Sequence, residues 1–440
     1  MTPQALFAGA VRAHEAGRLK EAERLYRQAL SLEPGHADAA SNLALVAAQA
    51  GRFGEAEAIL GGVLQRLPAH VPALANLALI LQQQKKHGEA IACCERALKL
   101  APDKKTRQKL SNTLALSLIG AQRFDDALEL LGAMVAAHPG FAGGQHLLGR
   151  VYVHLRRVDD AVQAFARAAK LDPTDSTPLV DAAECLLVHA RGGEALAYLD
   201  RALAARPWEV RALALRTLAL AGAGRQEEER RQSDPQRLVH CHRLAELGYT
   251  AERTLGLNRA LSAFASSEPS LRQDPPQYAT RNAWHSTTNL AEQANPALEE
   301  LKGFIDFAFR RRKAALSEEP PAHPFVQAAP ERYYLDLWAI RMKESGKLFP
   351  HIHVDGWLSG VYYVDVPAIV EDPAAGGAGW LTIGSSRLDI PLERSPLVRK
   401  VKPEPGMMVT FPSYLWHDTV PLPQDNAEQR LCLAFDLNPR

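Results

Sequence analysis

Apolar residues recur at helical spacing over the first half of the chain, in segments that come in pairs. The stretch SNLALVAAQAGRFGEAEAILGGVLQRLP, residues 41–68, contains two such runs with apolar residues every three or four positions, joined by a short turn and closed by proline. Prolines at 34, 68, 102, 139, 173 and 207 are 34 residues apart, except for one interval of 37 around PDKKTRQ. The pattern predicts a repeated helix–turn–helix unit.

Small residues stand at fixed distances before each proline. Alanine occurs twelve positions earlier every time: Ala22, Ala56, Ala90, Ala127, Ala161 and Ala195. A small or flexible residue occurs five positions earlier: Ala29, Val63, Ala97, Met134, Ala168 and Ala202. Small side chains let two helices approach closely, so we expect the two helices of each unit to pack on each other at these positions.

A 34-residue helix–turn–helix period resembles the tetratricopeptide repeat family over residues 5–225, as six to seven repeats. The resemblance implies an all-α solenoid whose concave surface docks a protein or peptide. The alternative is a spacer or a dimerisation arm. The charged run GRQEEERRQSDPQR then interrupts the pattern, and we expect capping helices or a linker over residues 226–254. His240 and His242 lie in this segment and are interpreted as ordinary surface histidines.

The period of the pattern changes to two after about residue 330. The runs RYYLDLWAIRM, LSGVYYVDV, GWLTIG, GMMVTFP and RLCLAFDL are rich in β-branched and aromatic residues and are separated by Gly and Pro. They predict a β-sandwich or barrel, with the helix NPALEELKGFIDFAFRRRKAAL packed on its outside. The fold class is therefore an α + β multidomain chain, an all-α solenoid followed by a β-domain with flanking helices.

The stretch HIHVD carries three metal-ligating residue types, His351, His353 and Asp355, in five positions. Residues i and i+2 of a strand project to the same side, so either adjacent pair of these residues could present two ligands to one ion. A third ligand would come from His417, at the end of another strand-like run. Two histidines and one carboxylate with an open face are typical of non-haem Fe(II) oxygenases. This favours His353, Asp355 and His417, and the set His351, His353 and His417 is the alternative.

Arg430 stands on the otherwise apolar strand RLCLAFDL. An unpaired guanidinium is costly to bury, so it requires an anionic partner. Asp436 is six positions along the same strand, too far for easy pairing. The distal carboxylate of 2-oxoglutarate would suit the planar guanidinium.

Three segments, FPHIHVDGWLSGVYYVDVP, VKPEPGMMVTFPSYLWHDTVP and RLCLAFDLNP, together with NAWHSTTNL upstream, resemble the 2-oxoglutarate and Fe(II)-dependent oxygenases, in the prolyl-hydroxylase-related branch. The resemblance covers residues 255–440 and implies a double-stranded β-helix, a distorted jelly roll. It implies Fe(II) and 2-oxoglutarate as cofactor and cosubstrate, with ascorbate as a stimulant. In that branch the motif often reads His-x-His without an acid at the position of Asp355. Tyr363 is at a position where related enzymes place a phenol near the cosubstrate, or it is a core residue.

Composition narrows the partners. Fifty-one Lys and Arg balance 50 Asp and Glu, which argues against nucleic acid and anionic membranes as partners. Five scattered cysteines and the absence of an 18-residue apolar run favour a cytoplasmic location. His285 either orients a substrate or caps the following helix. Three tryptophans either line the mouth of a site or are buried: Trp357, Trp380 and Trp416.

The sequence therefore predicts an Fe(II)- and 2-oxoglutarate-dependent dioxygenase. Because a peptide-docking solenoid precedes the β-domain, the expected reaction is hydroxylation of a side chain in a protein or peptide. Two alternatives are oxidation of a small molecule and a scaffold whose β-domain is catalytically silent. The complete ligand set and Arg430 argue against the silent scaffold.

Overall fold

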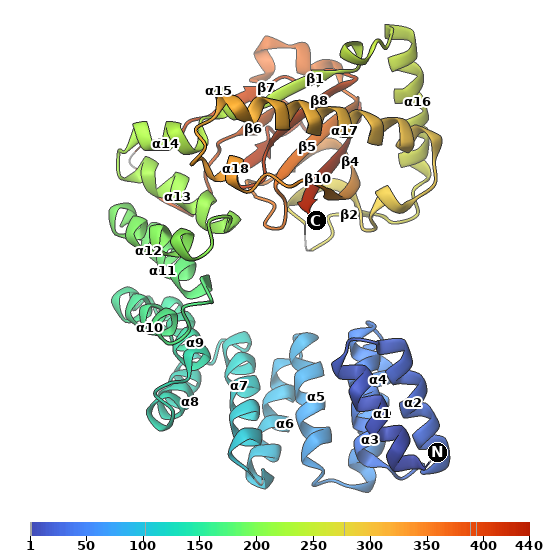
Figure 1. The fold of residues 1–440 in the computed structure, drawn as a ribbon, viewed down its shortest axis with the longest axis vertical. Coiled ribbons are helices and arrows are strands. Elements are labelled where there is room, and N and C mark those ends of the chain that lie inside the picture. Colours follow the sequence, from blue (N-terminus) through green and yellow to red (C-terminus); the bar gives the residue numbers. More distant parts are fainter. Residues whose placement is uncertain (1, 102, 277, 388, 393) are drawn as a thin grey trace. The chain divides into compact units, whose positions relative to one another are not determined.

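The computed structural model describes residues 2–101, 103–276, 278–387, 389–392 and 394–440. The chain forms two compact units, residues 1–172 and 173–440 (Figure 1). In the part of the chain that is described, no helix is long and apolar enough to span a bilayer.

The first unit consists of paired antiparallel helices. They are α1 (Pro3–Glu15), α2 (Leu19–Leu32), α3 (Ala37–Gln49), α4 (Phe53–Arg66), α5 (Val71–Gln83), α6 (His87–Leu100), α7 (Lys104–Gly120), α8 (Phe124–Ala137), α9 (Ala142–His154) and α10 (Val158–Leu171). Consecutive helices pack on each other, and apolar clusters connect neighbouring pairs. The predicted all-α repeat architecture is confirmed.

Alanine packing explains the period. The predicted close-approach residues Ala22, Ala56, Ala90, Ala127 and Ala161 are all completely buried. The irregular interval appears as a longer helix: α7 has 17 residues, whereas α1, α3, α5 and α9 have 13 each. Pro102, which was predicted to close the third repeat, lies outside the described residues. Asp103 begins α7 by accepting a hydrogen bond from the backbone N–H of Thr106.

The second unit combines helices with two antiparallel sheets. Its helices are α11 (Thr177–Val188), α12 (Gly192–Ala205), α13 (Val210–Gly222), α14 (Gln226–Ser233), α15 (Pro235–Leu238), α16 (Ala251–Ser267), α17 (Pro296–Ala315) and α18 (Pro324–Gln327). The pairs α11–α12 and α13–α14 continue the helical repeat pattern, yet they belong to the same compact unit as the sheets.

Among the residues that the structure describes, ten strands build two sheets. They are β1 (His240–Arg243), β2 (Leu271–Gln273), β3 (Thr280–Ser286), β4 (Tyr333–Leu348), β5 (Leu358–Asp365), β6 (Leu381–Ile383), β7 (Arg399–Val401), β8 (Met407–Pro412), β9 (His417–Thr419) and β10 (Arg430–Pro439). The larger sheet has the order β1-β8-β5-β10-β4-β3-β2 and the smaller β7-β6-β9. The five strands predicted from the period-two runs, now β4, β5, β6, β8 and β10, are confirmed. This is the predicted jelly-roll type of domain.

Helix α17 runs across one face of the larger sheet (Figure 1). Its Phe304 and Phe309 contact the rings of Tyr362 and Trp357. Tyr362 alternates along β5 with Val361, so the helix covers the face opposite to the one that Val361 occupies. The flanking helix predicted on the outside of the β-domain is therefore present.

The interpretation of His240 and His242 as surface histidines is wrong. Both lie in β1, which pairs with β8 at one edge of the larger sheet. His242 is 3% exposed, and its Nε2 lies 3.1 Å from Thr410 Oγ1. The helical spacing argument failed because the segment forms a strand, in which positions i and i+2 share a face.

Candidate metal centre

Two chain segments meet at the predicted metal site. His417 opens β9, and its backbone exchanges two 3.1 Å hydrogen bonds with the backbone of His351. Two residues later, the backbone N–H of His353 donates to the carbonyl of Ser413. These contacts bring three imidazoles together, and one ring nitrogen from each lies within 4.8 Å of the others.

Each imidazole is oriented by an acceptor at Nδ1. The Nδ1 atoms of His351 and His417 lie 2.7 Å and 3.0 Å from the carbonyl oxygens of Phe349 and Leu415. A carbonyl oxygen only accepts, so Nδ1 carries the proton and Nε2 keeps its lone pair. In His353, Nδ1 lies 2.8 Å from Oδ2 of Asp436. Such outer partners fix the tautomer and orientation of metal-binding histidines.

The arrangement calls for a cation. Nε2 of His353 and Nε2 of His417 lie only 3.2 Å apart. A neutral imidazole has a single N–H, and each of these two rings already uses it at Nδ1. The facing lone pairs therefore need a shared metal ion or an additional proton. Three imidazole nitrogens form a donor set that suits iron and other divalent transition metals.

Burial keeps two of these imidazoles unprotonated. Desolvation lowers the pKa of His351 to about 4, with neighbouring His353 acting in the same direction. Desolvation also holds the pKa of His417 well below its usual range, and this side chain is 5% exposed. Only an unprotonated imidazole binds a metal, so both rings are ready ligands at neutral pH.

Asp355 is not part of this group. Its side chain is exposed, and it follows Val354 in a turn that leaves the site. The structure brings together His351, His353 and His417, the alternative set, and does not add Asp355 to them. The expectation of a carboxylate two residues after His353 assumed that the strand continued. The chain turns instead, so the rule for i and i+2 no longer applies.

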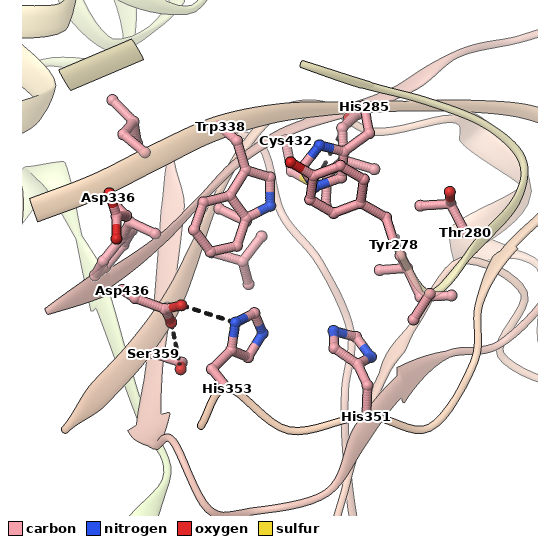
Figure 2. A pocket seen from close by; sticks show the side chains of 18 of the residues that line it. Tyr278, Thr280, His285, Asp336, Trp338, His351, His353, Ser359, Cys432 and Asp436 are labelled. Carbon is pink, nitrogen blue, oxygen red and sulfur yellow. Dashed lines mark hydrogen bonds and ion pairs between the residues drawn. The ribbon is translucent and has the colours of Figure 1, made fainter. Parts of the chain in front are cut away.

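The carboxylate of the site comes from Asp436, which the sequence did not identify in this role. Asp436 lies on β10 and also accepts a 2.6 Å hydrogen bond from Ser359, which in turn contacts Ser413. Figure 2 shows Asp436 between Ser359 and His353. The available signal was an acid on a strand of apolar residues, on the same face as Arg430.

A cavity of about 450 Å³ opens beside the three histidines. Strand β10 lines it with the alternate residues Arg430, Cys432, Ala434 and Asp436, and Phe435 adds to the wall. Arg430 is 1% exposed, donates from Nε to the carbonyl of Gly379 at 3.0 Å, and has its guanidinium 5.0 Å from the ring of Tyr363. Within the described residues, no carboxylate forms an ion pair with Arg430.

Two threonine hydroxyls at the cavity have no hydrogen-bond partner in the part of the chain that the structure describes. The hydroxyls of Thr280 and Thr419 are buried, and no hydrogen bond to either is found among the described residues, although both residues line the cavity. An unpaired buried guanidinium and two free hydroxyls fit a bound dicarboxylate such as 2-oxoglutarate. Tyr363 is fully buried against Arg430 and does not line the cavity, and burial raises the pKa of its phenol above the usual value.

Of the other residues that the sequence singled out, one histidine lines the cavity and three tryptophans do not. His285, on β3, lines the cavity and does not cap the next helix, where Asn289 takes that role. Trp380 is partly buried, Trp357 and Trp416 are buried, and none of the three lines the cavity. A tryptophan that does line the cavity is Trp338, which Figure 2 shows above His353.

Comparison with known families agrees with this architecture. Residues 336–436 match the family model described as "Putative 2OG-Fe(II) oxygenase". Residues 13–62, 71–104 and 112–176 match tetratricopeptide repeat models. The chain therefore joins tetratricopeptide repeats to a domain of the 2OG-Fe(II) oxygenase family.

Similarity to individual proteins is partial. The BBSome complex member BBS4 of Xenopus tropicalis is 31% identical over 102 residues, which are 23% of this chain and 19% of that protein. The matched region thus spans about a fifth of that relative. A tetratricopeptide repeat protein from Parabacteroides merdae is 15% identical, with a TM-score of 0.43 over 52% of this chain and 89% of its own. PilF of Pseudomonas aeruginosa is 18% identical, with a TM-score of 0.41 over 48% and 94%.

Proposed function

We propose that this protein is an Fe(II)- and 2-oxoglutarate-dependent dioxygenase that hydroxylates a side chain of a protein or peptide. The observation that carries the proposal is the convergence of three imidazoles whose Nδ1 atoms are all engaged elsewhere. This leaves three Nε2 lone pairs for one ion. The proposed ligands are His351, His353 and His417, with Asp436 orienting His353 and adding negative charge next to the ligands.

Arg430 would hold the distal carboxylate of 2-oxoglutarate, and the hydroxyl of Thr419 would donate to the same group. The ring of Tyr363 would stabilise the guanidinium of Arg430 through a cation–π contact. When bound, Fe(II) and 2-oxoglutarate would supply the oxidative chemistry, in which one oxygen atom of dioxygen enters succinate, with release of carbon dioxide, and the other enters a C–H bond of the substrate. Apolar residues of the cavity wall, such as Val361, Leu381 and Phe411, limit the access of water to the ligands.

The tetratricopeptide repeats support a macromolecular substrate, since such repeats dock proteins or peptides. Oxidation of a small molecule is the second candidate, because the cavity has the volume of a small-molecule site. A catalytically silent domain would not require a buried arginine without an ion-pair partner and three imidazoles at the same cavity.

The test is an assay of the purified protein with Fe(II), ascorbate and 2-oxoglutarate, with succinate measured in the presence and absence of cell extract. We expect slow succinate formation alone and faster formation with extract that contains the substrate. No succinate under either condition, from protein that binds Fe(II), would refute the proposal.

A further inference from the structure

The cavity has ends of opposite charge. Arg430 and Asp436 lie on the same face of β10, six residues apart, which corresponds to roughly 20 Å along a strand. Asp336 of β4 lies directly opposite Asp436 in the strand register, and it also lines the cavity. One end is therefore suited to an anion and the other to a cation.

At the acidic end, Asp436 is paired with His353, whereas Asp336 has no cationic partner among the described residues. The donors that the structure gives Asp336 are neutral amides, at 2.9 Å from Asn289 and 2.7 Å from Asn438. Desolvation raises the pKa of Asp336, and the charges of Asp436, Asp355 and Glu292 add to the shift. Over the described ranges, no Lys or Arg forms an ion pair with Asp336, Asp355 or Glu292. Like charges that face each other across two strands are destabilising, so this end of the cavity favours a cation.

Aromatic rings form a continuous wall from this end into the cavity. The ring of Trp338 stacks on His353 at 5.5 Å and on His285 at 5.9 Å, and His285 stacks on Tyr278 at 3.7 Å. Trp338 follows Asp336 by two residues on β4, so the indole and the carboxylate share one face. An indole face beside a carboxylate is suited to an ammonium or guanidinium group.

His285, which belongs to this wall, offers a hydrogen-bond acceptor to the cavity. His285 is 4% exposed, and its Nδ1 lies 2.6 Å from the carbonyl of Ser286, so Nδ1 is the donor and Nε2 is an acceptor. Among the residues that the structure describes, none donates to Nε2. Desolvation lowers the pKa of His285 to about 4, so the ring is neutral at pH 7. An acceptor in the cavity wall is satisfied by a ligand that brings N–H donors.

We infer that the cavity recognises a cationic side chain of the substrate, a lysine or an arginine, with Asp336 pairing with the charge and Trp338 covering its aliphatic stem. This inference rests on the proposed function and names the substrate class of the same site. Because Trp338 also stacks on His353, the carbon atoms of a side chain lying along the indole are close to the metal ligands. The charged group of the substrate would be recognised by Asp336, and the C–H bonds to be oxidised would be those of the adjacent carbon chain.

The experiment measures binding without turnover. The full-length protein, loaded with Fe(II) and 2-oxoglutarate under anaerobic conditions, is titrated calorimetrically with acetylated and amidated Gly-Gly-X-Gly-Gly peptides. X is lysine, arginine, glutamine or norleucine, and n-butylammonium is a fifth probe. We expect at least one cationic peptide to bind about ten-fold more tightly than the glutamine and norleucine peptides, an advantage that declines as salt is added.

Three variants locate the effect. Asp336→Asn, which preserves size, should remove the preference for a cation, and Trp338→Leu should weaken binding of all the peptides. Asp425→Asn neutralises an exposed acid that does not line the cavity, and it should leave the preference intact. Thermal melting of each variant checks the fold.

Three outcomes would overturn the inference: equal affinity for all peptides, binding of none of the cationic probes, or an unchanged preference in Asp336→Asn. Tight binding of n-butylammonium with no gain from the peptide would place a free amine, and not a protein side chain, in the site and would also overturn it. Succinate formation by the same preparation tests the oxygenase activity separately, so the two failures are distinguishable.

Discussion

The indole N–H of Trp416 donates to the backbone oxygen of Ala214 in α13, at 3.1 Å. Trp416 directly precedes His417, so a proposed metal ligand is held against a helix that the sequence assigns to the repeats. Tyr414, two residues earlier, donates from its hydroxyl to the carbonyl of Gln232 in α14 at 2.6 Å. The last helical repeats thus support the segment that carries His417.

Trp416→Phe should lower metal affinity several-fold, because it keeps the ring but removes the hydrogen bond that fixes the position of His417. A competition titration with a chelating dye measures the effect. Trp380→Phe is the matched control, since the Trp380 indole donates to the carbonyl of Val370 at 3.1 Å and Trp380 does not line the cavity. Equal affinities in both variants would mean that α13 does not position the ligand.

Asp436→Ala should weaken metal binding by about 10- to 100-fold, because His353 loses the acceptor that orients it. His351→Ala should cost at least as much, since it removes a ligand. Asp355→Ala should have little effect on the affinity, because that carboxylate is exposed and outside the histidine group. The same titration ranks the three variants. A severe loss in Asp355→Ala with a mild one in His351→Ala would restore the register first expected from the sequence.

Arg430→Ala should raise the concentration of 2-oxoglutarate needed for half-saturation by a factor of about ten to 150, the value of a charged hydrogen-bonded pair at roughly 1.5–3 kcal/mol. Arg430→Lys should recover only part of this, because an ammonium keeps the charge and loses the planar fork. Metal affinity should be unchanged in both variants. Identical 2-oxoglutarate affinity in wild type and variants would make Arg430 a structural residue.

Acid should destabilise the second unit through buried histidines. Desolvation lowers the pKa of His242 to about 4, against an ordinary value of 6.5. The unfolded chain therefore binds more protons between these values, so the contribution to stability is complete above about pH 6.5, falls as the pH decreases, and is lost near pH 4. The change for this residue is on the order of 3 kcal/mol.

All six tryptophans lie in residues 173–440, so urea unfolding followed by tryptophan fluorescence reports on this unit alone. His242→Gln should show a smaller loss of unfolding free energy between pH 7 and pH 4.5 than wild type. Part of the loss should remain, because His240 and His323 have similarly lowered pKa values of about 4. Identical pH profiles would show that His242 does not contribute.

The repeat period and the strands were predictable because each rests on local periodicity. The completely buried alanines, such as Ala56, stand where the spacing of the prolines places them. Long-range pairing was not predictable in this way. Strands β1 and β9 have only four and three residues, which are too few to show the alternation of apolar and polar side chains that distinguishes a strand from a turn or a helix. The role of Asp436 depends on the register between β10 and β5, which brings it opposite Ser359. The sequence alone does not specify that register.

At the candidate site too, residue type and local spacing were predictable, whereas contacts that depend on the path of the chain were not. His353, His417 and Arg430 were identified from residue type and spacing, and the structure places all three at one cavity. The preference for Asp355 rested on the charge that a carboxylate brings to a metal site, and in the structure the chain turns after His353 and leaves Asp355 exposed. Trp338 was missed as a cavity residue because an aromatic residue on an alternating strand is as often core as lining.

The most direct test of the central claim compares wild type with His417→Ala for Fe(II) stoichiometry and succinate formation in one preparation. We predict one Fe(II) per wild-type chain and 2-oxoglutarate-dependent succinate. The variant should have neither, while its far-UV circular dichroism keeps the helical signal of the repeats. Undiminished Fe(II) binding and succinate formation by folded His417→Ala would contradict the assignment of the metal centre.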